Sequence, residues 1–308
     1  MFLYTLDNKR YHTFNYFLKT KFNSKVFKVA LDAGFSCPNK VTGGCIFCAD
    51  GSKSNITDNK KSIEEQFTEV KNIMHKKWPD GKYIPYLQAN TNTLDTVDKL
   101  KEIYEPLINQ ENVVGFAIAT RPDAISDEVL DYLSDINKRT FLMIELGLQS
   151  SYDETLRFIN RGHDRKCFED MVKKLKNRGI FVVAHIINGL PNETKDMMVE
   201  TAKYLNSINI DAIKIHMLHV VKNTKLADIY QKTPFKILTK DEYIDIVCEQ
   251  LALLKPEIVI ERITGDPIIE NLIAPTWLLK KFVLLNDIDK EMKKRNYYQG
   301  IKCSDQNK

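Results

Sequence analysis

Three cysteines lie close together near the start of the chain, in the stretch CPNKVTGGCIFC at residues 37–48. Cys37, Cys45 and Cys48 supply three thiolates, whereas a structural zinc site closes with four protein ligands. One candidate is a Cys₃His zinc site completed by His12 or His75, although neither histidine stands at zinc-finger spacing. The other is a [4Fe–4S] cluster, in which three protein thiolates leave one iron open to a further ligand.

The residues between these cysteines suit an iron–sulfur cluster. Gly43 and Gly44 allow backbone N–H groups to approach sulfur atoms closely. Phe47 directly precedes Cys48, and we expect its ring to shield the centre from water. The other cysteines are far apart in the sequence and are expected to be small buried apolar side chains: Cys167, Cys248 and Cys303.

The rest of the chain alternates apolar, β-branched runs with amphipathic segments. The runs are almost continuously apolar, as strands buried on both faces of a parallel sheet are. Strands are expected at 26–31, 83–89, 113–120, 140–147, 180–187 and 212–218, with a further possible strand at 256–264. Helices are expected after the capping-box residue Ser62 and over 94–108, 126–136, 165–178, 193–207, 240–254 and 276–296.

Serial strand–helix units predict parallel strands joined by right-handed crossovers. Neither a GxGxxG motif nor a P-loop follows the first expected strand, which weakens the open nucleotide-binding sheets as alternatives. We therefore predict an α/β fold, a partial (β/α)₆ TIM-like barrel over residues 1–225. A C-terminal helical extension over 226–308 is expected to pack on this barrel.

Polar residues follow the expected strands at the ends where barrels of this kind place their chemistry. They carry amide, charged or imidazole side chains: Gln88, Asn90 and Asn92 after the second strand, Arg121 after the third, Glu145 near the end of the fourth and His185 on the fifth. Gly189, directly after the fifth strand, would let the backbone approach a ligand closely. So many polar strand ends predict a polar ligand at the mouth of the barrel.

Several motifs together resemble the radical S-adenosylmethionine (radical SAM) superfamily. They are GFSCPN, GGCIFC, QANTNT, ATRPD, ELGLQS, INRGHD, HIINGLPNET and the closing APTWLL…LNDIDKEMKKRNYYQG. Together they are most similar to the small bacterial proteins of the YhcC/YtqA type, which are related to the radical domain of the Elongator catalytic subunit. One departure is the cysteine loop, which looks shorter than in those relatives, with seven residues between Cys37 and Cys45.

The resemblance implies a [4Fe–4S] cluster held by Cys37, Cys45 and Cys48, with S-adenosylmethionine as second cofactor. It implies reductive cleavage of S-adenosylmethionine to a 5′-deoxyadenosyl radical that abstracts a substrate hydrogen. The cofactor-binding residues expected on this basis are Gln88, Asn90 and Asn92 for the amino group, Glu145 for the ribose hydroxyls, Gly189 for the adenine and Arg121 for the cofactor or an anionic substrate. An interior ion pair between Glu145 and Arg121 is the alternative for that carboxylate.

The relation to Elongator implies a tRNA substrate, with modification of the side chain of a wobble uridine, and a reductant such as flavodoxin or ferredoxin. A radical SAM enzyme acting on a small metabolite or a protein is one alternative. A non-catalytic metal-cluster binding protein is another, but the retained polar strand ends argue against it. We expect a cytoplasmic protein without a membrane partner, because the N-terminus is unlike a signal peptide and no run approaches about 18 apolar residues.

The net charge of +4 arises entirely from the last part of the chain. Residues 276–308 contain eight Lys or Arg against four Asp or Glu, and the first 275 residues contain 37 of each sign. Six of these cations surround the last expected helix, and two tyrosines follow: Lys280, Lys281, Lys290, Lys293, Lys294 and Arg295, then Tyr297 and Tyr298. They could guide an anticodon loop toward the barrel mouth, although a solvated helix end has the same composition.

Overall fold

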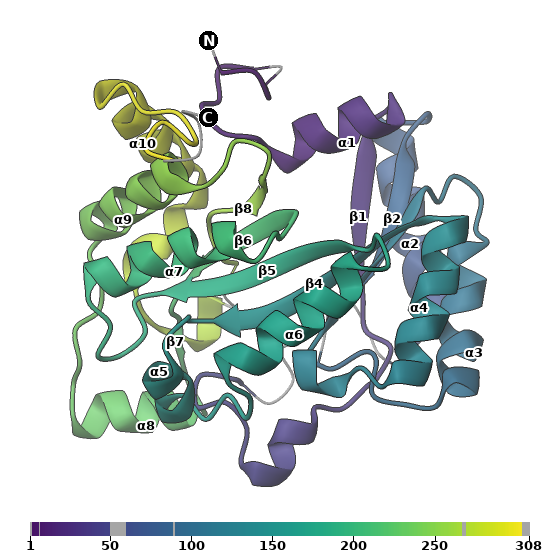
Figure 1. The fold of residues 1–308 in the computed structure, drawn as a ribbon, viewed down its shortest axis with the longest axis horizontal. Helices are drawn as coiled ribbons and strands as arrows, with labels where there is room; N and C mark the ends of the chain where they lie inside the picture. Colours follow the sequence, from purple (N-terminus) through teal and green to yellow (C-terminus); the bar gives the residue numbers. More distant parts are fainter. Residues whose placement is uncertain (1, 6, 50–59, 89, 267–268, 304–308) are drawn as a thin grey trace.

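The computed structural model describes residues 2–5, 7–49, 60–88, 90–266 and 269–303. Its main element is a sheet of seven parallel strands in the order β1-β2-β3-β4-β5-β6-β8, curled into a partial barrel (Figure 1). The strands are β1 (Val26–Leu31), β2 (Lys82–Leu87), β3 (Gly115–Thr120), β4 (Phe141–Gln149), β5 (Phe181–Asn188), β6 (Ala212–Met217) and β8 (Val259–Arg262). Two short strands, β7 (Val220–Val221) and β9 (Leu272–Ala274), form a separate antiparallel pair.

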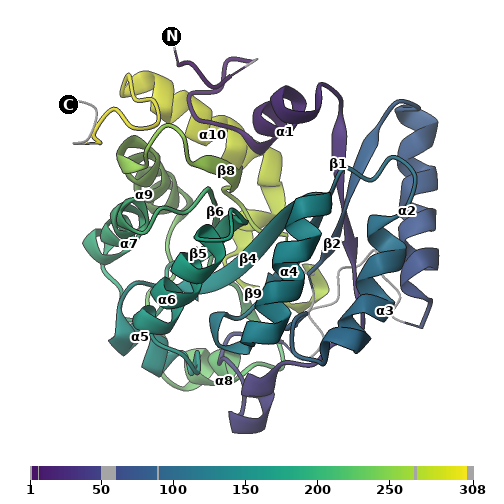
Figure 2. The same cartoon turned by 45° about the vertical axis from the view of Figure 1, so that its right-hand side comes forward.

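Helices alternate with the strands, and most of them cover the convex face of the sheet, whereas the first helix packs against the concave face (Figures 1 and 2). They are α1 (Phe14–Phe22), α2 (Ile63–Lys77), α3 (Val97–Ile108), α4 (Asp127–Arg139), α5 (Asp153–Phe158), α6 (Arg165–Lys176), α7 (Lys195–Ser207), α8 (Lys225–Lys232), α9 (Lys240–Leu253) and α10 (Lys281–Lys294). The expected capping box at the start of α2 is present, since Ser62 accepts from the backbone of Glu65 and its own N–H is bound by that carboxylate.

The predicted partial barrel and its six strands are confirmed, and the possible strand at 256–264 is the seventh. This strand, β8, runs parallel to β6, with Ala212 paired to Val259. It comes from the region that we predicted as an extension, so that region contributes to the sheet as well as packing on it. The helices α1, α5 and α8 were not predicted; α5 and α8 are only six and eight residues long.

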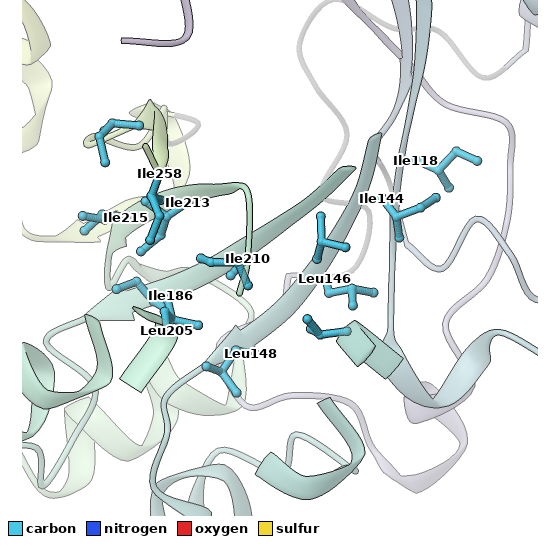
Figure 3. Close-up of a cluster of buried hydrophobic side chains, with 14 of the residues drawn as sticks. Ile118, Ile144, Leu146, Leu148, Ile186, Leu205, Ile210, Ile213, Ile215 and Ile258 are labelled. Carbon is cyan, nitrogen blue, oxygen red and sulfur yellow. The ribbon is translucent and has the colours of Figure 1, made fainter. Parts of the chain in front are cut away.

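Strand β4 shows how alternation separates the two faces of the sheet. Its residues 142, 144, 146 and 148 belong to the apolar core beneath the helices. Figure 3 shows part of this core, where Ile144 and Leu146 lie with Leu205 of α7 and strand residues such as Ile186. The opposite, concave face begins with Phe141 and Met143, which join an apolar cluster closed by Leu18 of α1. Toward the carboxyl ends of the strands the concave face becomes polar, beginning with Glu145 on β4.

The two ends of the molecule carry different features (Figures 1 and 2). The cysteine loop, with a short 3₁₀ helix at Pro38–Thr42, lies at the carboxyl ends of the strands. The end of α10 lies at the opposite end, close to the N-terminal segment, where the backbone N–H of Gln299 donates to the carbonyl of Arg10. Within the described residues, none of the helices has the length and apolarity needed to span a bilayer.

Candidate active site

A cavity of about 390 Å³ opens at the carboxyl ends of the strands. It brings together all three cysteines of the loop and four of the other predicted site residues. The lining consists of Cys37, Lys40, Gly43, Gly44, Cys45, Phe47, Cys48, Tyr86, Gln88, Asn90, Thr91, Ala119, Thr120, Arg121, Glu145, Gly147, Gln149, Arg161, His185, Asn223, Thr224 and Lys225. The predicted polar mouth is therefore one continuous site.

The loop that carries the cysteines is shaped by a turn that glycine permits. Gly43 and Gly44 have φ values of 90° and 72°, in the left-handed region that L side chains rarely adopt. This turn lets the N–H of Gly44 donate to the carbonyl of Asn39 at 2.7 Å, and the N–H of Cys48 donates to the carbonyl of Cys45 at 3.0 Å. The three thiols thus reach one cavity, and Phe47 lines it beside them.

Two hydrogen-bond donors lie close to the sulfur of Cys45. The Nδ2 of Asn39 lies 3.4 Å from Cys45 Sγ, and the Nη1 of Arg161 lies 3.7 Å from it. Burial and the neighbouring thiols of Cys45 and Cys37 raise the pKa of the Cys48 thiol, whereas Lys40 and Arg161 act in the opposite direction. Cationic and amide donors around thiolates are the environment in which a metal–sulfur centre is stabilised.

The floor of the cavity is a buried ionic layer centred on Glu145, which is 1 % exposed. Three donors converge on its Oε2: the Tyr86 hydroxyl at 2.7 Å, His185 Nε2 at 2.7 Å and Lys214 Nζ at 2.6 Å. Lys28 binds its Oε1. A second carboxylate, Glu261, accepts from Lys28 at 2.5 Å and lies 3.3 Å from Lys214 Nζ.

This layer fixes the ionisation of its members. Burial by itself raises the pKa of Glu145, but Lys214 and Lys28 outweigh burial and hold that pKa well below its usual value. Burial lowers the pKa of His185, although the hydrogen bond that its imidazole donates to Glu145 opposes this effect. Burial and the charge of Glu145 raise the pKa of Tyr86. The floor therefore presents an ionised carboxylate that is surrounded by donors, a neutral imidazole and a neutral phenol.

Arg121 lies in the wall of the cavity. It forms its ion pair with Asp123 and not with Glu145, the partner that the sequence analysis considered. Its Nε and Nη2 donate to the two carboxylate oxygens of Asp123 at 2.9 and 2.7 Å. The proposed Glu145–Arg121 pair is therefore wrong. An interior ion pair of Glu145 does exist, but its partners are Lys28 and Lys214. The motif ATRPD supplies its own counter-charge.

Two predicted cofactor residues do not line the cavity. Asn92 is buried, and its Nδ2 donates to the carbonyls of Leu87 and Ala119, so it joins β2 to β3. Thr91 lines the cavity in its place. Gly189 lies beside Leu238 in separate cavities. Cofactor contacts for Asn92 and Gly189 stay predictions that this arrangement does not favour.

Several site residues were missed in the sequence: Tyr86, Lys28, Lys214, Glu261 and Arg161. Lys28 and Lys214 carried a usable signal, because each is a lone charge within an apolar run, VFKVAL or AIKIHML. Such a charge must find a partner on the same face of the sheet. Arg161 stands within the motif INRGHD and lines the cavity, whereas His163 of the same motif does not.

The cavity fits a cluster better than a zinc ion. Among the described residues, no three His, Cys, Asp or Glu side chains converge tightly enough to hold one metal ion. A cubane places each thiolate on a different iron and does not require this convergence. Neither proposed zinc histidine completes a site, since His12 is buried with its Nδ1 3.2 Å from the carbonyl of Pro256, and His75 lies in the last turn of α2.

Comparison with known proteins agrees with this geometry. The Radical SAM superfamily matches residues 35–205, and the Radical_SAM C-terminal domain matches residues 210–294. YtqA of Bacillus subtilis is 47 % identical over 304 residues, which cover 97 % of this chain and 94 % of YtqA. Elongator complex protein 3 of Schizosaccharomyces pombe is 29 % identical over 181 residues, 58 % of this chain but only 32 % of that protein.

A solved structure shows the same fold. The archaeal Methanocaldococcus infernus Elp3 with an N-terminal deletion superposes with a TM-score of 0.69 at 18 % identity, over 90 % of this chain and 64 % of that one. The family uses a [4Fe–4S] cluster and S-adenosylmethionine, and the three cysteines and open cavity fit both. The chain therefore belongs to the radical SAM superfamily, within which it is a relative of YtqA.

Proposed function

We propose that this radical SAM enzyme modifies tRNA, acting on the side chain of a wobble uridine in the cytoplasm. The observation that carries the proposal is the cavity itself, which joins three cysteines, strand-end amides and two buried arginines at an open mouth. The tRNA substrate is supported by the relation to Elongator complex protein 3. It is also supported by the motifs ATRPD and NRGH, which resemble those of the Elongator-type radical domain.

The chain's own residues would bind and orient the cofactors. When bound, the cluster and S-adenosylmethionine supply the 5′-deoxyadenosyl radical that abstracts hydrogen from the substrate. Cys37, Cys45 and Cys48 would hold the cluster, and Phe47 would exclude water from it. Gln88 and Asn90 lie at the end of β2 and offer amide groups to the amino-acid end of S-adenosylmethionine.

The floor of the cavity would receive the polar part of the bound molecules. The carboxylate oxygens of Glu145 already accept from four side chains, so Glu145 acts by holding its neighbours rather than by binding ribose directly. Tyr86 and His185 line the cavity and are oriented by this carboxylate. They are the groups through which the floor would contact a ligand.

A tRNA partner would reach the mouth through its phosphates. Lys40 and Lys225 line the rim of the cavity, where cations favour an anionic backbone. The protein also needs a one-electron reductant, for which flavodoxin or ferredoxin is the expected class. Neither partner requires a membrane.

The function is tested by comparing nucleoside digests of tRNA from a deletion strain and its parent. We expect the deletion strain to lose a modified wobble uridine or to accumulate its precursor. The gene should restore the modification, whereas the same gene carrying Cys45→Ala should not. Identical digests in all strains would reject tRNA and favour a small metabolite or a protein as substrate.

A further inference from the structure

The most unusual charge near the cavity is the guanidinium of Arg161. Its residue is only 7 % exposed. Its Nε and Nη2 donate to the carbonyl of Gly147 at 3.2 and 2.7 Å, and its Nη1 donates to Cys45 Sγ at 3.7 Å. Among the residues that the structure describes, no Asp or Glu forms an ion pair with it. Its cation is therefore buried against neutral acceptors and one sulfur.

Arg121, in the wall of the same cavity, is a buried arginine whose charge is neutralised by a carboxylate. It is 3 % exposed, but Asp123 binds it through both carboxylate oxygens. The remaining Nη1 of Arg121 donates to the carbonyl of Arg161 at 2.9 Å and so fixes the backbone of that residue. One arginine thus has a carboxylate as its counter-charge, and the other is held in place without one.

A buried cation without a counter-charge is costly, by several kcal/mol in general. Such a group is retained where an anion occupies the adjoining space. The thiolates are the anions that the chain itself places there. A cubane with three thiolates is negatively charged overall, and it becomes one unit more negative when it accepts an electron.

The turn that carries Arg161 also grips the cysteine loop. Asn160 Nδ2 donates to the carbonyls of Thr42 and Gly44 at 3.1 and 2.7 Å. Asn39 Nδ2 returns a bond of 2.7 Å to the carbonyl of Asn160. At Gly162, φ is 80° and a Cβ would collide with Asn39 Oδ1, so only glycine allows this close approach. The position of the guanidinium relative to Cys45 is therefore rigidly set.

We propose that Arg161 is the built-in counter-cation of the cluster, a positioning residue that raises the cluster's reduction potential through its contact with Cys45. A fixed positive charge beside the thiolate stabilises the reduced, more negative cluster more than the oxidised one. Hydrogen bonds to the sulfurs and burial are known to set the potential of such clusters. The role extends the established cofactor chemistry and is independent of the tRNA proposal.

The test is a redox titration of reconstituted protein without substrate. The electron paramagnetic resonance signal of the reduced cluster measures the reduced fraction at each potential. We expect Arg161→Gln to retain the cluster and to lower the ratio of reduced to oxidised protein about tenfold at a fixed potential, which corresponds to 59 mV for one electron. Arg161→Lys keeps the charge and should shift the ratio less. Arg157→Gln removes an exposed cation four residues away and should leave the ratio unchanged.

The outcomes separate cleanly. If Arg161→Gln fails to bind iron while Arg161→Lys binds it, the requirement for a cation is supported. An intact cluster with an unchanged midpoint in Arg161→Gln overturns the proposal. So does equal loss of iron in both variants when their circular dichroism stays native, because the side chain would then be needed for its shape. A shift in Arg157→Gln as large as in Arg161→Gln would overturn it as well.

Discussion

The floor and the wall of the cavity both bury charged side chains, but they balance them differently. On the floor, Glu145 and Glu261 face Lys28 and Lys214, so two acids meet two bases. On the wall, Arg161 meets only a carbonyl and a sulfur. Charge neutralised within the chain serves to position neighbouring groups. Charge left without a carboxylate identifies where a ligand has to supply it.

The cations of α10 form a third arrangement, which is mostly exposed and paired locally. Arg295 binds Glu291 and Asp245 at 2.8 and 2.7 Å, and Lys294 lies 3.4 Å from Glu291. Exposed lysines such as Lys294 contribute little through their pairs, since solvent screens them, and Arg295 is already neutralised by two carboxylates. A positive excess counted along the sequence is therefore a weaker indication of a ligand site than one buried cation.

The largest expected effect is at the cysteine loop, whose thiols face Arg161 of the wall. Single changes Cys37→Ala, Cys45→Ala and Cys48→Ala should each abolish the cluster, because each removes one of its three thiolates. Anaerobically reconstituted parent protein should contain about four irons and four sulfides per chain. Cys167→Ala is the matched control, since this cysteine lies in the first turn of α6 and does not line the cavity. Stoichiometric zinc without iron uptake would contradict the assignment.

The next largest effect is expected from a change in the ionic layer of the floor. This change should lower the free energy of unfolding and leave the iron content unaffected. Glu145→Gln leaves Lys28 and Lys214 with a single carboxylate, which should cost about 3–5 kcal/mol of unfolding free energy. Urea denaturation measures this loss. Glu105→Gln breaks a partly exposed pair with Arg139 and should cost only about 1 kcal/mol.

A second change sharpens the test of the floor. Adding Lys214→Met to Glu145→Gln should restore part of the lost stability, because it removes the cation that was left unpaired. The ionic layer would not be the balanced unit described here if Glu145→Gln cost no more than Glu105→Gln.

Glu193 applies the same rule to a partly buried carboxyl that forms no ion pair with any described Lys or Arg. Burial raises its pKa to about 7, although hydrogen bonds from Ser150 and Thr155 oppose the shift. The folded state therefore binds a proton that the unfolded state releases between about pH 4.5 and 7. This contribution to stability is present at low pH and is lost as the pH rises through 7.

Glu193→Gln should consequently gain about 1–3 kcal/mol relative to the parent between pH 5 and pH 8. Unfolding free energies measured in urea at pH 5, 6, 7 and 8 test this slope. The exposed neighbour Glu154 serves as control, and Glu154→Gln should follow the parent. Parallel curves for Glu193→Gln and the parent would show that this carboxyl is ionised throughout.

The smallest effect is expected on α10. Lys293 and Lys294 are exposed and belong to the last turn of α10. The end of this helix lies at the opposite end of the molecule from the cysteine loop (Figures 1 and 2). If tRNA binds at the mouth, Lys293→Glu with Lys294→Glu should change its affinity less than about twofold, whereas Lys225→Glu at the rim should weaken it and flatten its salt dependence. Filter binding at several salt concentrations separates these. A stronger effect from the α10 variant would restore the helix as the tRNA guide.

Much of the framework could be predicted because its signals are local. Apolar runs of six to nine residues indicated the strands, and the polar groups directly after them indicated the mouth. For this reason the residues expected at the mouth include seven that line one cavity in the structure: Cys37, Cys45, Cys48, Gln88, Asn90, Arg121 and Glu145. Asn92 shows the limit, because a shift of one residue after a strand decides whether Thr91 or Asn92 faces the cavity.

Local sequence patterns are enough to predict the parallel sheet, the three thiolates and the end of the barrel at which they lie. Which charges neutralise each other depends on contacts between distant parts of the chain. The partners of Lys28 are 117 and 233 residues away, and Arg161 reaches Cys45 across 116 residues. Strand periodicity fixes which face a residue occupies, but the curvature of the sheet sets which residues meet across the barrel. The long-range geometry therefore pairs Glu145 with Lys28 and Lys214 and places Arg161 against the sulfur of Cys45.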